Sequence, residues 1–318
     1  MSARAVAVVG AGSAGRRHLK VLAAAGARPL AVTRRPEAAA ELRAAGVETV
    51  ADLAAAKALG AAACVIATET GRHAAVAEAA FALGLDALIE KPLAVDALEG
   101  RRVADAARRS GRKAFVACVL RFSPSLSRAR ALLPELGAVH AVRVECRSYL
   151  PDWRPGRDLR AGYAAGAAQG GVLRDLIHEV DYAGWLFGFP REASGAAANL
   201  GRLGLASDEV AEILWRLPGG GTLSIGLDYL TRPARRRLSV HGEHGTLEWD
   251  ALAGTAALSL VGQQPRVEAA AEDADARFLD QARAFLGALD GFADERLASL
   301  DDGVRALSVC DAVRARSG

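Results

Sequence analysis

Two side chains that could move a proton near neutral pH stand out in this sequence. Lys91 lies at the end of Asp86-Ala-Leu-Ile-Glu-Lys-Pro92, and His178 has Asp175 and Asp181 three residues away on either side. A partly desolvated ammonium has a lowered pKa, so it can exchange a proton or stabilise an alkoxide. A carboxylate beside an imidazole raises the pKa of the imidazole and fixes its tautomer. Together the two groups suit the removal of a hydroxyl proton while hydride leaves the same carbon.

Each of these side chains also has a simpler structural interpretation. A lysine after an edge strand is often a surface residue, and a lone histidine on a helix is often structural. The acids around His178 could ligate a metal, but no second histidine lies at ligand spacing and hydride transfer requires no metal. We predict Lys91, His178 and Asp175 as catalytic residues and expect no metal.

A glycine-rich turn near the start of the chain suits a nucleotide. Gly10-Ala-Gly-Ser-Ala-Gly15 follows the apolar run Ala5–Val9 and precedes a helical stretch at Arg16–Ala25. Its first glycine permits a tight turn, its second lets the backbone approach a pyrophosphate, and its third lets helix and strand pack closely. The helix N-terminus adds N–H groups and partial positive charge. The predicted cofactor contacts in this turn are Gly10, Gly12, Ser13, Ala14 and Gly15.

The residues after the second predicted strand bear on the choice of cofactor. A carboxylate there would bind the ribose of NAD and repel the 2′-phosphate of NADP. This chain has Thr33, Arg34 and Arg35 instead, with no carboxylate before Glu37. Hydroxyl and guanidinium groups donate to phosphate, so we predict a preference for NADP, with NAD as the alternative. Solvated arginines in an Arg-rich protein are the simpler interpretation.

Further cofactor contacts are expected where two later apolar runs end. The carboxyl ends of strands line the ligand crevice of a doubly wound sheet. Thr68 and Thr70 are therefore predicted on the nicotinamide side, and Glu90 is predicted to anchor the Lys91 ammonium or the cofactor ribose. His73 fits a cofactor contact and a structural position at a helix start equally well.

Buried strands alternate with helices through the first part of the chain. The expected strands are Ala5–Val9, Pro29–Thr33, Val47–Val50, Ala61–Thr68, Ala87–Glu90 and Lys113–Leu120. Helices between them imply right-handed crossovers and a parallel sheet. The predicted fold class is α/β, with an NAD(P)-binding Rossmann domain, a doubly wound parallel sheet, over residues 1–120.

Residues 121–318 follow a different pattern and form the expected substrate-binding and oligomerisation domain. A long Gly- and Arg-rich loop precedes Leu173–Phe187, which is predicted as one helix with Asp175, His178 and Tyr182 on one face. Successive strands then predict an α+β domain with an open, largely antiparallel sheet. These strands are Ala138–Ser148, Glu209–Leu217, Gly221–Tyr229, Arg236–His241 and Thr246–Trp249. Packing of the C-terminal helix back on the first domain is an alternative.

Composition limits the classes of protein that need consideration. The length of 318 residues suits two domains, and a hydrophobic content of 51% allows a sizeable core. The net charge is +3 with scattered basic residues, so we expect no nucleic-acid partner. No apolar run reaches membrane-spanning length, the chain begins directly with a strand, and the 4 cysteines show no paired spacing. We therefore expect a cytoplasmic protein with reduced thiols and no membrane partner.

In their order and spacing, these motifs resemble the Gfo/Idh/MocA family (glucose–fructose oxidoreductase and inositol dehydrogenase) over nearly the whole chain. The resemblance is carried by the glycine turn, Glu90-Lys-Pro92, the Gly170-Gly171 helix, Arg121-Phe-Ser-Pro124 and Gly242-Glu-His-Gly-Thr-Leu-Glu-Trp249. It implies an NAD(P)-dependent oxidoreductase acting on CH–OH groups of a sugar, cyclitol or sugar acid. It also implies a homodimer or homotetramer formed through the C-terminal sheet.

The resemblance assigns the family's catalytic Lys, Asp and His to Lys91, Asp175 and His178. Many members place the Asp four residues before the His, whereas Asp175 lies three before it, so this assignment is the weakest of the three. The segment Leu150-Pro-Asp-Trp-Arg-Pro-Gly-Arg157 is similar to a subgroup often linked to sialic-acid-like sugars. The predicted substrate contacts are Lys91, Arg121, Trp153, Arg154, Asp175 and His178. Guanidinium groups suit an anionic sugar, and solvated loop arginines are the alternative.

Two other functions remain open at this stage. A tightly bound nicotinamide could oxidise a ring carbon transiently and permit elimination or hydration without net redox change, as in a lyase or hydratase. A non-catalytic nucleotide sensor is the second alternative, although a sensor would not need Lys91 and His178.

Overall fold

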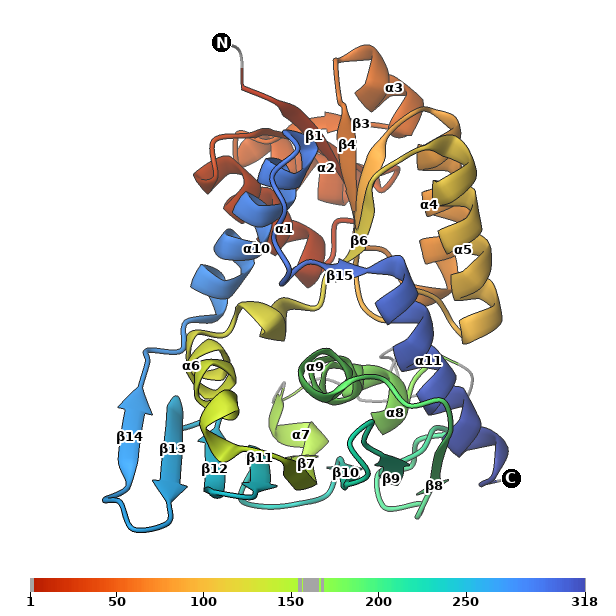
Figure 1. Cartoon of the computed structure of the whole chain (residues 1–318). Helices are drawn as coiled ribbons and strands as arrows, with labels where there is room; N and C mark the ends of the chain where they lie inside the picture. Colours follow the sequence, from red (N-terminus) through yellow and green to blue (C-terminus); the bar gives the residue numbers. More distant parts are fainter. Residues whose placement is uncertain (1–2, 154–155, 157–165, 167–168, 318) are drawn as a thin grey trace. The chain divides into compact units, whose positions relative to one another are not determined.

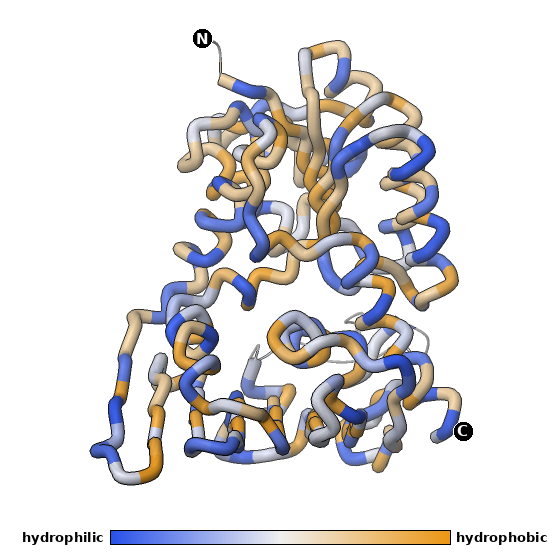
Figure 2. Tube along the Cα trace, in the orientation of Figure 1, coloured by the Kyte–Doolittle hydropathy of each residue, from blue (hydrophilic) through white to orange (hydrophobic). Residues whose placement is uncertain are grey.

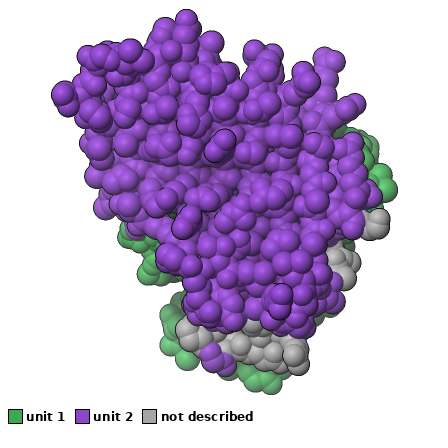
Figure 3. All heavy atoms as spheres, turned by 90° about the horizontal axis from the view of Figure 1, so that it is seen from below, with its two compact units in different colours: residues 1–122, 273–304 green, residues 123–272, 305–318 purple. Residues whose placement is uncertain are grey.

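The computed structural model describes residues 3–153, 156, 166 and 169–317. The chain divides into two compact units (Figure 3): unit 1 comprises residues 1–122 and 273–304, and unit 2 comprises residues 123–272 and 305–318. Residues 121–318 were expected to form the second domain, with packing of the C-terminal helix on the first domain as the alternative, and in the structure residues 273–304 belong to unit 1.

Unit 1 contains a seven-stranded sheet in the order β15-β6-β5-β4-β1-β2-β3 (Figure 1). Its strands are β1 (Ala5–Val9), β2 (Arg28–Val32), β3 (Glu48–Val50), β4 (Ala63–Ile66), β5 (Asp86–Ile89), β6 (Ala114–Val116) and β15 (Ala298–Ser299). Neighbouring strands are parallel except for the short pair of β15 and β6. The predicted doubly wound parallel sheet is therefore confirmed, with β15 as an unpredicted antiparallel edge.

Helices cover both faces of this sheet (Figure 1). They are α1 (Ser13–Ala24), α2 (Pro36–Ala44), α3 (Leu53–Ala58), α4 (His73–Ala82), α5 (Ala97–Ser110) and α10 (Ala274–Leu289). Helices α1 and α10 lie together on one face, and α4 and α5 lie on the other. Figure 2 shows hydrophobic residues gathered along the strands, whereas hydrophilic residues recur along α5.

The apolar face of α10 explains why this late helix belongs to unit 1. Phe285 is fully buried in the same cluster as Val8 and Leu22, and its ring lies edge-on to Phe115 at 6.4 Å. Burial of one such side chain stabilises a fold by about 1.5–3 kcal/mol. The helix therefore contributes to the core under α1 although it follows the second sheet in sequence.

Unit 2 contains an eight-stranded sheet in the order β14-β13-β12-β11-β7-β10-β9-β8. The strands are β7 (Val139–Arg147), β8 (Ala193–Ala198), β9 (Val210–Arg216), β10 (Thr222–Asp228), β11 (Arg235–Gly242), β12 (Gly245–Asp250), β13 (Thr255–Leu260) and β14 (Arg266–Ala269). Within this sheet, β7 and β10 pair in parallel, and the other strand pairs of its described residues are antiparallel. The largely antiparallel sheet is confirmed, and the two strands predicted at Arg236–His241 and Thr246–Trp249 pair as β11 and β12, whereas β8, β13 and β14 were not predicted.

Helices of unit 2 lie over one face of its sheet (Figure 1). They are α6 (Pro124–Leu132), α7 (Leu150–Trp153), α8 (Val172–Asp175), α9 (Ile177–Phe187) and the later part of α11 (Leu300–Ala315), which begins in unit 1. Side chains of β9 alternate between buried and exposed, with Ala211, Ile213 and Trp215 inward. That alternation is typical of a strand with one face on a core and one toward water.

The single helix predicted for Leu173–Phe187 is wrong. Leu176, with φ −95° and ψ 26°, separates α8 from α9. Asp175 therefore ends α8, whereas His178 lies in the first turn of α9, so helical spacing does not place Asp175 on one face with His178 and Tyr182. Tyr182 is fully buried with its ring edge-on to Trp249, whereas His178 is half-buried.

Two smaller expectations concern the thiols and the membrane. All four cysteines are free and buried, as predicted, and burial raises the pKa of Cys64 to about 12. Among the helices of the described residues, none combines the length and apolarity needed to cross a bilayer.

Candidate active site

Three of the predicted segments meet at one edge of the unit 1 sheet. In the parallel register, Val9 of β1 lies beside Ile66 of β4, which lies beside Ile89 of β5. The next residues continue the hydrogen bonding, because the Ala67 N–H donates to the Val9 carbonyl at 2.8 Å and the Glu90 N–H to the Ile66 carbonyl at 2.9 Å. The glycine turn, the Thr68 loop and Lys91 therefore begin on neighbouring strands at the same carboxyl edge, as the sequence analysis expected.

The glycines of the first turn have three different constraints. A Cβ on Gly10, which has φ +113°, would lie 2.3 Å from the Ala67 carbonyl oxygen, and one on Gly15 would lie 1.9 Å from the Gly10 oxygen. A Cβ on Gly12 would meet nothing within 4 Å. Gly10 and Gly15 are thus required by the protein's own backbone, whereas Gly12 leaves space open.

The open space at Gly12 fits the pyrophosphate of a dinucleotide. Gly12 is the N-cap of α1, and no side chain caps its first N–H groups. Ser13 and Ala14 follow in the first turn, with Ser13 exposed. Uncapped N–H groups and the helix dipole favour an anion at this position.

The residues predicted to distinguish NADP from NAD lie just beyond β2. Thr33 is half-buried, and Arg34 and Arg35 are exposed. The Arg35 N–H donates to the Thr33 hydroxyl at 3.3 Å. This arrangement leaves both guanidinium groups at the surface beside the strand end.

His73 connects the loops that follow β4 and β5. Its buried ring contacts the Pro92 carbonyl through Nδ1 at 2.9 Å and the Thr68 carbonyl through Nε2 at 3.0 Å. These contacts favour the structural interpretation of His73. Thr68 is half-buried and donates through its hydroxyl to the Glu69 carbonyl at 3.3 Å, and Thr70 is buried.

Glu90 is held by a residue that sequence reasoning missed. His18 of α1 is buried, and its Nε2 lies 2.8 Å from Glu90 Oε1. Burial works to raise the pKa of Glu90, but the hydrogen bond and charge of His18, with Lys91 and His73, outweigh it and lower that pKa. Nothing in the spacing of α1 and β5 indicates the pair, because only the packed sheet brings His18 to Glu90.

The backbone on both sides of Lys91 is fixed by these neighbours. The Lys91 N–H donates to Glu90 Oε2 at 3.1 Å, and the following Pro92 carbonyl contacts His73. The Lys91 side chain is half-buried. Glu90 thus anchors the main chain of Lys91 and bonds to His18, and its predicted contact with the Lys91 ammonium or the cofactor ribose stays a prediction.

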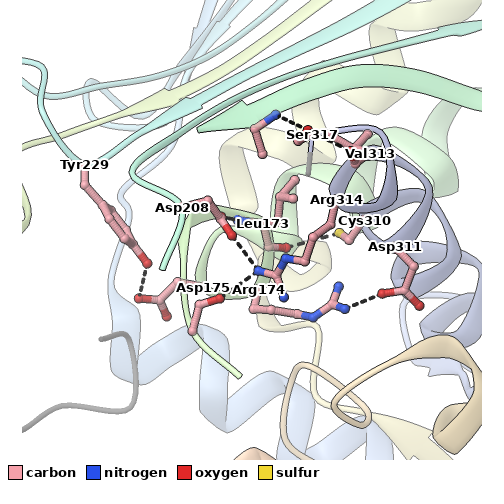
Figure 4. Close-up of polar contacts among 12 residues, drawn as sticks. Leu173, Arg174, Asp175, Asp208, Tyr229, Cys310, Asp311, Val313, Arg314 and Ser317 are labelled. Atoms are coloured by element: carbon pink, nitrogen blue, oxygen red, sulfur yellow. Dashed lines mark hydrogen bonds and ion pairs between the residues drawn. The ribbon is translucent and has the colours of Figure 1, made fainter. Parts of the chain in front are cut away.

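In unit 2, Asp175 is hydrogen-bonded to another residue that sequence reasoning missed. The Tyr229 hydroxyl donates to Asp175 Oδ2 at 3.0 Å (Figure 4). Tyr229 is fully buried directly after β10, and Asp175 is only 9% exposed. The predicted strand Gly221–Tyr229 contained this tyrosine, but no local pattern distinguished its hydroxyl from that of other core tyrosines.

Charged groups hold the turn that precedes Asp175. The Leu173 N–H donates to Asp208 Oδ2 at 3.0 Å, and Arg314 donates to Asp208 Oδ1 at 2.6 Å and to the Gly170 carbonyl at 3.0 Å. A Cβ on Gly171, with φ +87°, would lie 2.5 Å from the Asp208 carboxylate. Gly171 is therefore needed for close packing against Asp208.

Two residues of α11, Cys310 and Asp311, also hold α8 in place. Arg174, which is buried, donates to Asp311 of α11, and the Cys310 thiol donates to the Leu173 carbonyl at 3.1 Å (Figure 4). Arg174 thus forms an ion pair within unit 2.

His178 lies in the first turn of α9 and is half-buried, between the buried Ile177 and Glu179. Glu179 Oε1 lies 2.8 Å from Arg236 Nε on β11, which ties this turn to the sheet. Asp181 is buried. Orientation of the His178 imidazole by Asp175 or Asp181 stays a prediction.

The remaining predicted substrate contacts differ in accessibility. Trp153 is 42% exposed, donates through Nε1 to the Ser148 hydroxyl at 2.9 Å and lies edge-on to Tyr229 at 5.7 Å. Arg121 is 1% exposed and donates to Asp302 Oδ2 at 3.3 Å, which favours a structural role within unit 1. Arg154 lies outside the described residues.

The predicted site residues therefore form two groups. The glycine turn, Thr68, Glu90 and Lys91 share one edge of the unit 1 sheet. Asp175 and Trp153 are joined through Tyr229 in unit 2, with His178 on the next helix. The meeting of Lys91 with His178 stays a prediction.

Comparisons with known proteins agree with the two units. The family described as GFO_IDH_MocA, an oxidoreductase family with an NAD-binding Rossmann fold, matches residues 4–118. The GFO/IDH/MocA C-terminal domain matches residues 127–248. The myo-inositol dehydrogenase Hyg17 of Streptomyces leeuwenhoekii is 30% identical over 299 residues, which cover 88% of this chain and 87% of that protein.

Solved structures show the same fold. Levoglucosan dehydrogenase in complex with NADH and levoglucosan superposes with a TM-score of 0.85 at 19% identity, over 98% of this chain and 96% of the other. UDP-N-acetylglucosamine 3-dehydrogenase GnnA from Acidithiobacillus ferrooxidans superposes with a TM-score of 0.80 at 23% identity, over 100% and 98% of the chains. At these identities, the likeness establishes the fold alone.

Proposed function

Since the chain belongs to the Gfo/Idh/MocA family of NAD-binding oxidoreductases, we propose that it transfers hydride between a nicotinamide cofactor and a secondary alcohol or ketone of a sugar, cyclitol or sugar acid. The observation that carries the proposal is the shared sheet edge at which the open glycine turn and the anchored Lys91 both lie. Binding of a dinucleotide there would bring its reactive ring to the strand ends.

Each protein group has a separate part in the proposed reaction. The N–H groups at the start of α1 would hold the pyrophosphate, and the bound nicotinamide would supply or accept hydride. His178, oriented by Asp175, takes or returns the hydroxyl proton of the substrate. The Lys91 ammonium stabilises the negative charge that develops on the substrate oxygen and relays the proton.

Turnover by the purified protein tests this proposal. A panel of sugars, cyclitols and sugar acids, supplied with NAD or NADP, should produce the absorbance of reduced nicotinamide with at least one substrate. Replacement of Lys91 with Ala should lower kcat by about 10²–10⁴ if Lys91 acts as a general acid or base. Lys57→Ala, an exposed lysine on α3, is the matched control. An unchanged kcat for Lys91→Ala would remove Lys91 from the mechanism.

The same assay separates the alternative chemistry. A redox-neutral lyase or hydratase would convert a sugar without added cofactor and without a net change in nicotinamide absorbance. A sensor would bind the dinucleotide and convert no member of the panel.

The preference for NADP is supported by the surface beside β2. Thr33, Arg34 and Arg35 offer a hydroxyl and two exposed guanidinium groups where NAD-specific sites place a carboxylate. The ratio of kcat/KM for NADPH and NADH measures this preference directly. A higher kcat/KM with NADH would contradict it.

The acidic-sugar part of the proposal depends on the arginines of the loop around Trp153. Arg154, Arg157 and Arg160 belong to that loop in the sequence and lie outside the described residues. A neutral pyranose and its uronic acid, compared in the same assay, test whether a carboxylate raises kcat/KM. Equal values would favour a neutral substrate.

A homodimer or homotetramer formed through the unit 2 sheet is the proposed assembly. Helices α6 and α9 lie on one face of this sheet (Figure 1), so the opposite face is the candidate for contact with a second copy. Light scattering coupled to size-exclusion chromatography measures the assembly, and a monomeric mass would contradict the proposal.

A further inference from the structure

The hydroxyl of Tyr229 lies at a junction between two predicted site residues. It is fully buried, and it donates to Asp175 Oδ2 at 3.0 Å (Figure 4). The Tyr229 ring also packs in a T-shaped arrangement with the Trp153 ring, with centroids 5.7 Å apart and planes at 88°. One side chain thus joins α8, which ends in Asp175, to α7, which ends in Trp153.

The backbone around Tyr229 is held on both sides. Its N–H donates to the Glu209 carbonyl at 3.0 Å, and its carbonyl accepts from the Leu150 N–H at 3.0 Å. The preceding Asp228 accepts from the N–H groups of Leu230 and Thr231 at 2.9 and 2.8 Å, which fixes the turn after β10. The phenol therefore approaches Asp175 from a rigid strand end.

The protonation state of Tyr229 determines the direction of its hydrogen bond to Asp175. Burial, and then the neighbouring Asp175 charge, raise the pKa of Tyr229 well above its usual value of 10.0. The phenol consequently stays protonated and can only donate to the carboxylate. A hydrogen bond to a charged acceptor is roughly twice as strong as one between neutral groups.

We infer that Tyr229 is the positioning residue of Asp175, holding its carboxylate in the orientation that the proposed reaction requires of it. This inference rests on the proposed function, because Asp175 is there the residue that orients His178. Because the helix breaks at Leu176, the separate helices α8 and α9 do not themselves fix Asp175 relative to His178. Tyr229 supplies the restraint that a continuous helix would have supplied.

The helix of His178 contains a matched control for the loss of a buried hydroxyl. Tyr182 is also fully buried, and within the described part of the chain its hydroxyl has no hydrogen-bond partner. Tyr182→Phe and Tyr229→Phe remove the same atom from equally buried rings. Only the second removes a bond to Asp175, and it preserves the ring that contacts Trp153.

The test is a double-mutant cycle in kcat with Tyr229→Phe, Asp175→Ala and the double variant, measured beside Tyr182→Phe. Loss of a hydrogen bond to a charged group corresponds to about 10- to 150-fold. We expect Tyr229→Phe to lower kcat by this factor, with the dissociation constant of the cofactor unchanged because the glycine turn lies in unit 1. We expect no further loss when Tyr229→Phe is added to Asp175→Ala, and wild-type kcat for Tyr182→Phe.

Several results would overturn the inference. A Tyr229→Phe protein with wild-type kcat would overturn it. So would a Tyr229→Phe substitution that lowers kcat by the same factor in the wild-type and the Asp175→Ala backgrounds. If the wild-type protein converts no member of the substrate panel, the proposed function fails. Thermal unfolding is then compared for the wild type, Tyr229→Phe, Asp175→Ala and the double variant. A decrease in Tm caused by Tyr229→Phe that disappears in the Asp175→Ala background supports the restraint, whereas an equal decrease in both backgrounds refutes it.

Discussion

Alanine at Gly12 and at Gly15 should have opposite effects on stability, although the two glycines belong to one turn. Gly12 has φ −76° and ψ −172°, which an L-residue adopts without strain, and its Cβ would meet nothing within 4 Å. A substitution of Gly by Ala at a compatible position stabilises a protein by about 0.4–1 kcal/mol through the unfolded chain. At Gly15 the Cβ would lie 1.9 Å from the Gly10 carbonyl oxygen, which is backbone and cannot rotate away.

The magnitudes follow from these two environments. Gly12→Ala should raise Tm by about 1–4 °C, given about 2–4 °C per kcal/mol for proteins of comparable size. It should weaken dinucleotide binding by about 5- to 150-fold, which corresponds to an overpacking cost of about 1–3 kcal/mol in the bound state. Gly15→Ala should lower stability by at least about 3 kcal/mol, because the helix must move away from the strand.

The measurements are thermal unfolding without cofactor and a fluorescence titration with the reduced dinucleotide. A Gly12→Ala protein that is more stable than wild type yet binds the dinucleotide poorly would locate the close approach of the pyrophosphate. Wild-type affinity in Gly12→Ala would refute the placement of the cofactor at this turn. A Gly15→Ala protein with wild-type Tm would refute the packing of α1 on β1.

Three further predictions concern charged groups. The pKa of Glu90 is lowered, so its carboxylate stabilises the folded protein at pH values above its ordinary pKa of 4.5. Glu90→Gln should therefore be less stable than wild type at pH 7. This difference in stability should vanish as the pH falls through the folded-state pKa of Glu90. The double variant Arg34→Ala/Arg35→Ala should weaken NADP binding by about 10- to 150-fold and leave NAD binding unchanged, measured as the two dissociation constants. Asp311→Ala should lower the free energy of unfolding by about 3 kcal/mol, because it leaves the buried charge of Arg174 without its partner. This value is at the low end for a broken buried ion pair, since Asp311 is partly exposed.

Controls make each of these outcomes decisive. A stability difference for Glu90→Gln that does not change with pH would contradict a role for its charge. Arg43→Ala removes an exposed arginine of α2 that donates to Thr49, so it should change neither dissociation constant. Replacing both members of the Arg174–Asp311 pair with Leu should restore much of the stability lost in Asp311→Ala, and failure to do so would assign the loss to packing.

Local pattern alone was sufficient to place the glycine turn and Lys91 at one edge of the first sheet. Short apolar runs alternating with helices predict a parallel sheet, and parallel strands end at a common edge, so the glycine turn and Lys91 were expected together. The structure confirms that shared edge. The same reasoning found Glu90 but not its partner, because the contact of His18 with Glu90 links residues far apart in sequence.

The substrate half of the site required the tertiary structure. Helical spacing predicted one helix containing Asp175 and His178, and the break at Leu176 overturned that expectation. Tyr229 was assigned to a strand, yet nothing in the sequence distinguishes a core tyrosine from one that donates to a carboxylate on another element. The return of α10 to the first sheet was equally hidden, since its apolar face could have packed on either unit.

There is a physical reason why local sequence predicted some of these features and tertiary packing decided the others. Strand ends, tight turns and helix starts depend on sterics and hydrogen bonds among residues close in the chain, so amino-acid type and spacing determine them. The partners of Glu90, Asp175 and Arg174 are chosen by which elements pack together, and that choice depends on the summed burial of many side chains. The sequence therefore determined which chemistry this chain carries, and the packed fold decided which side chains hold it in place.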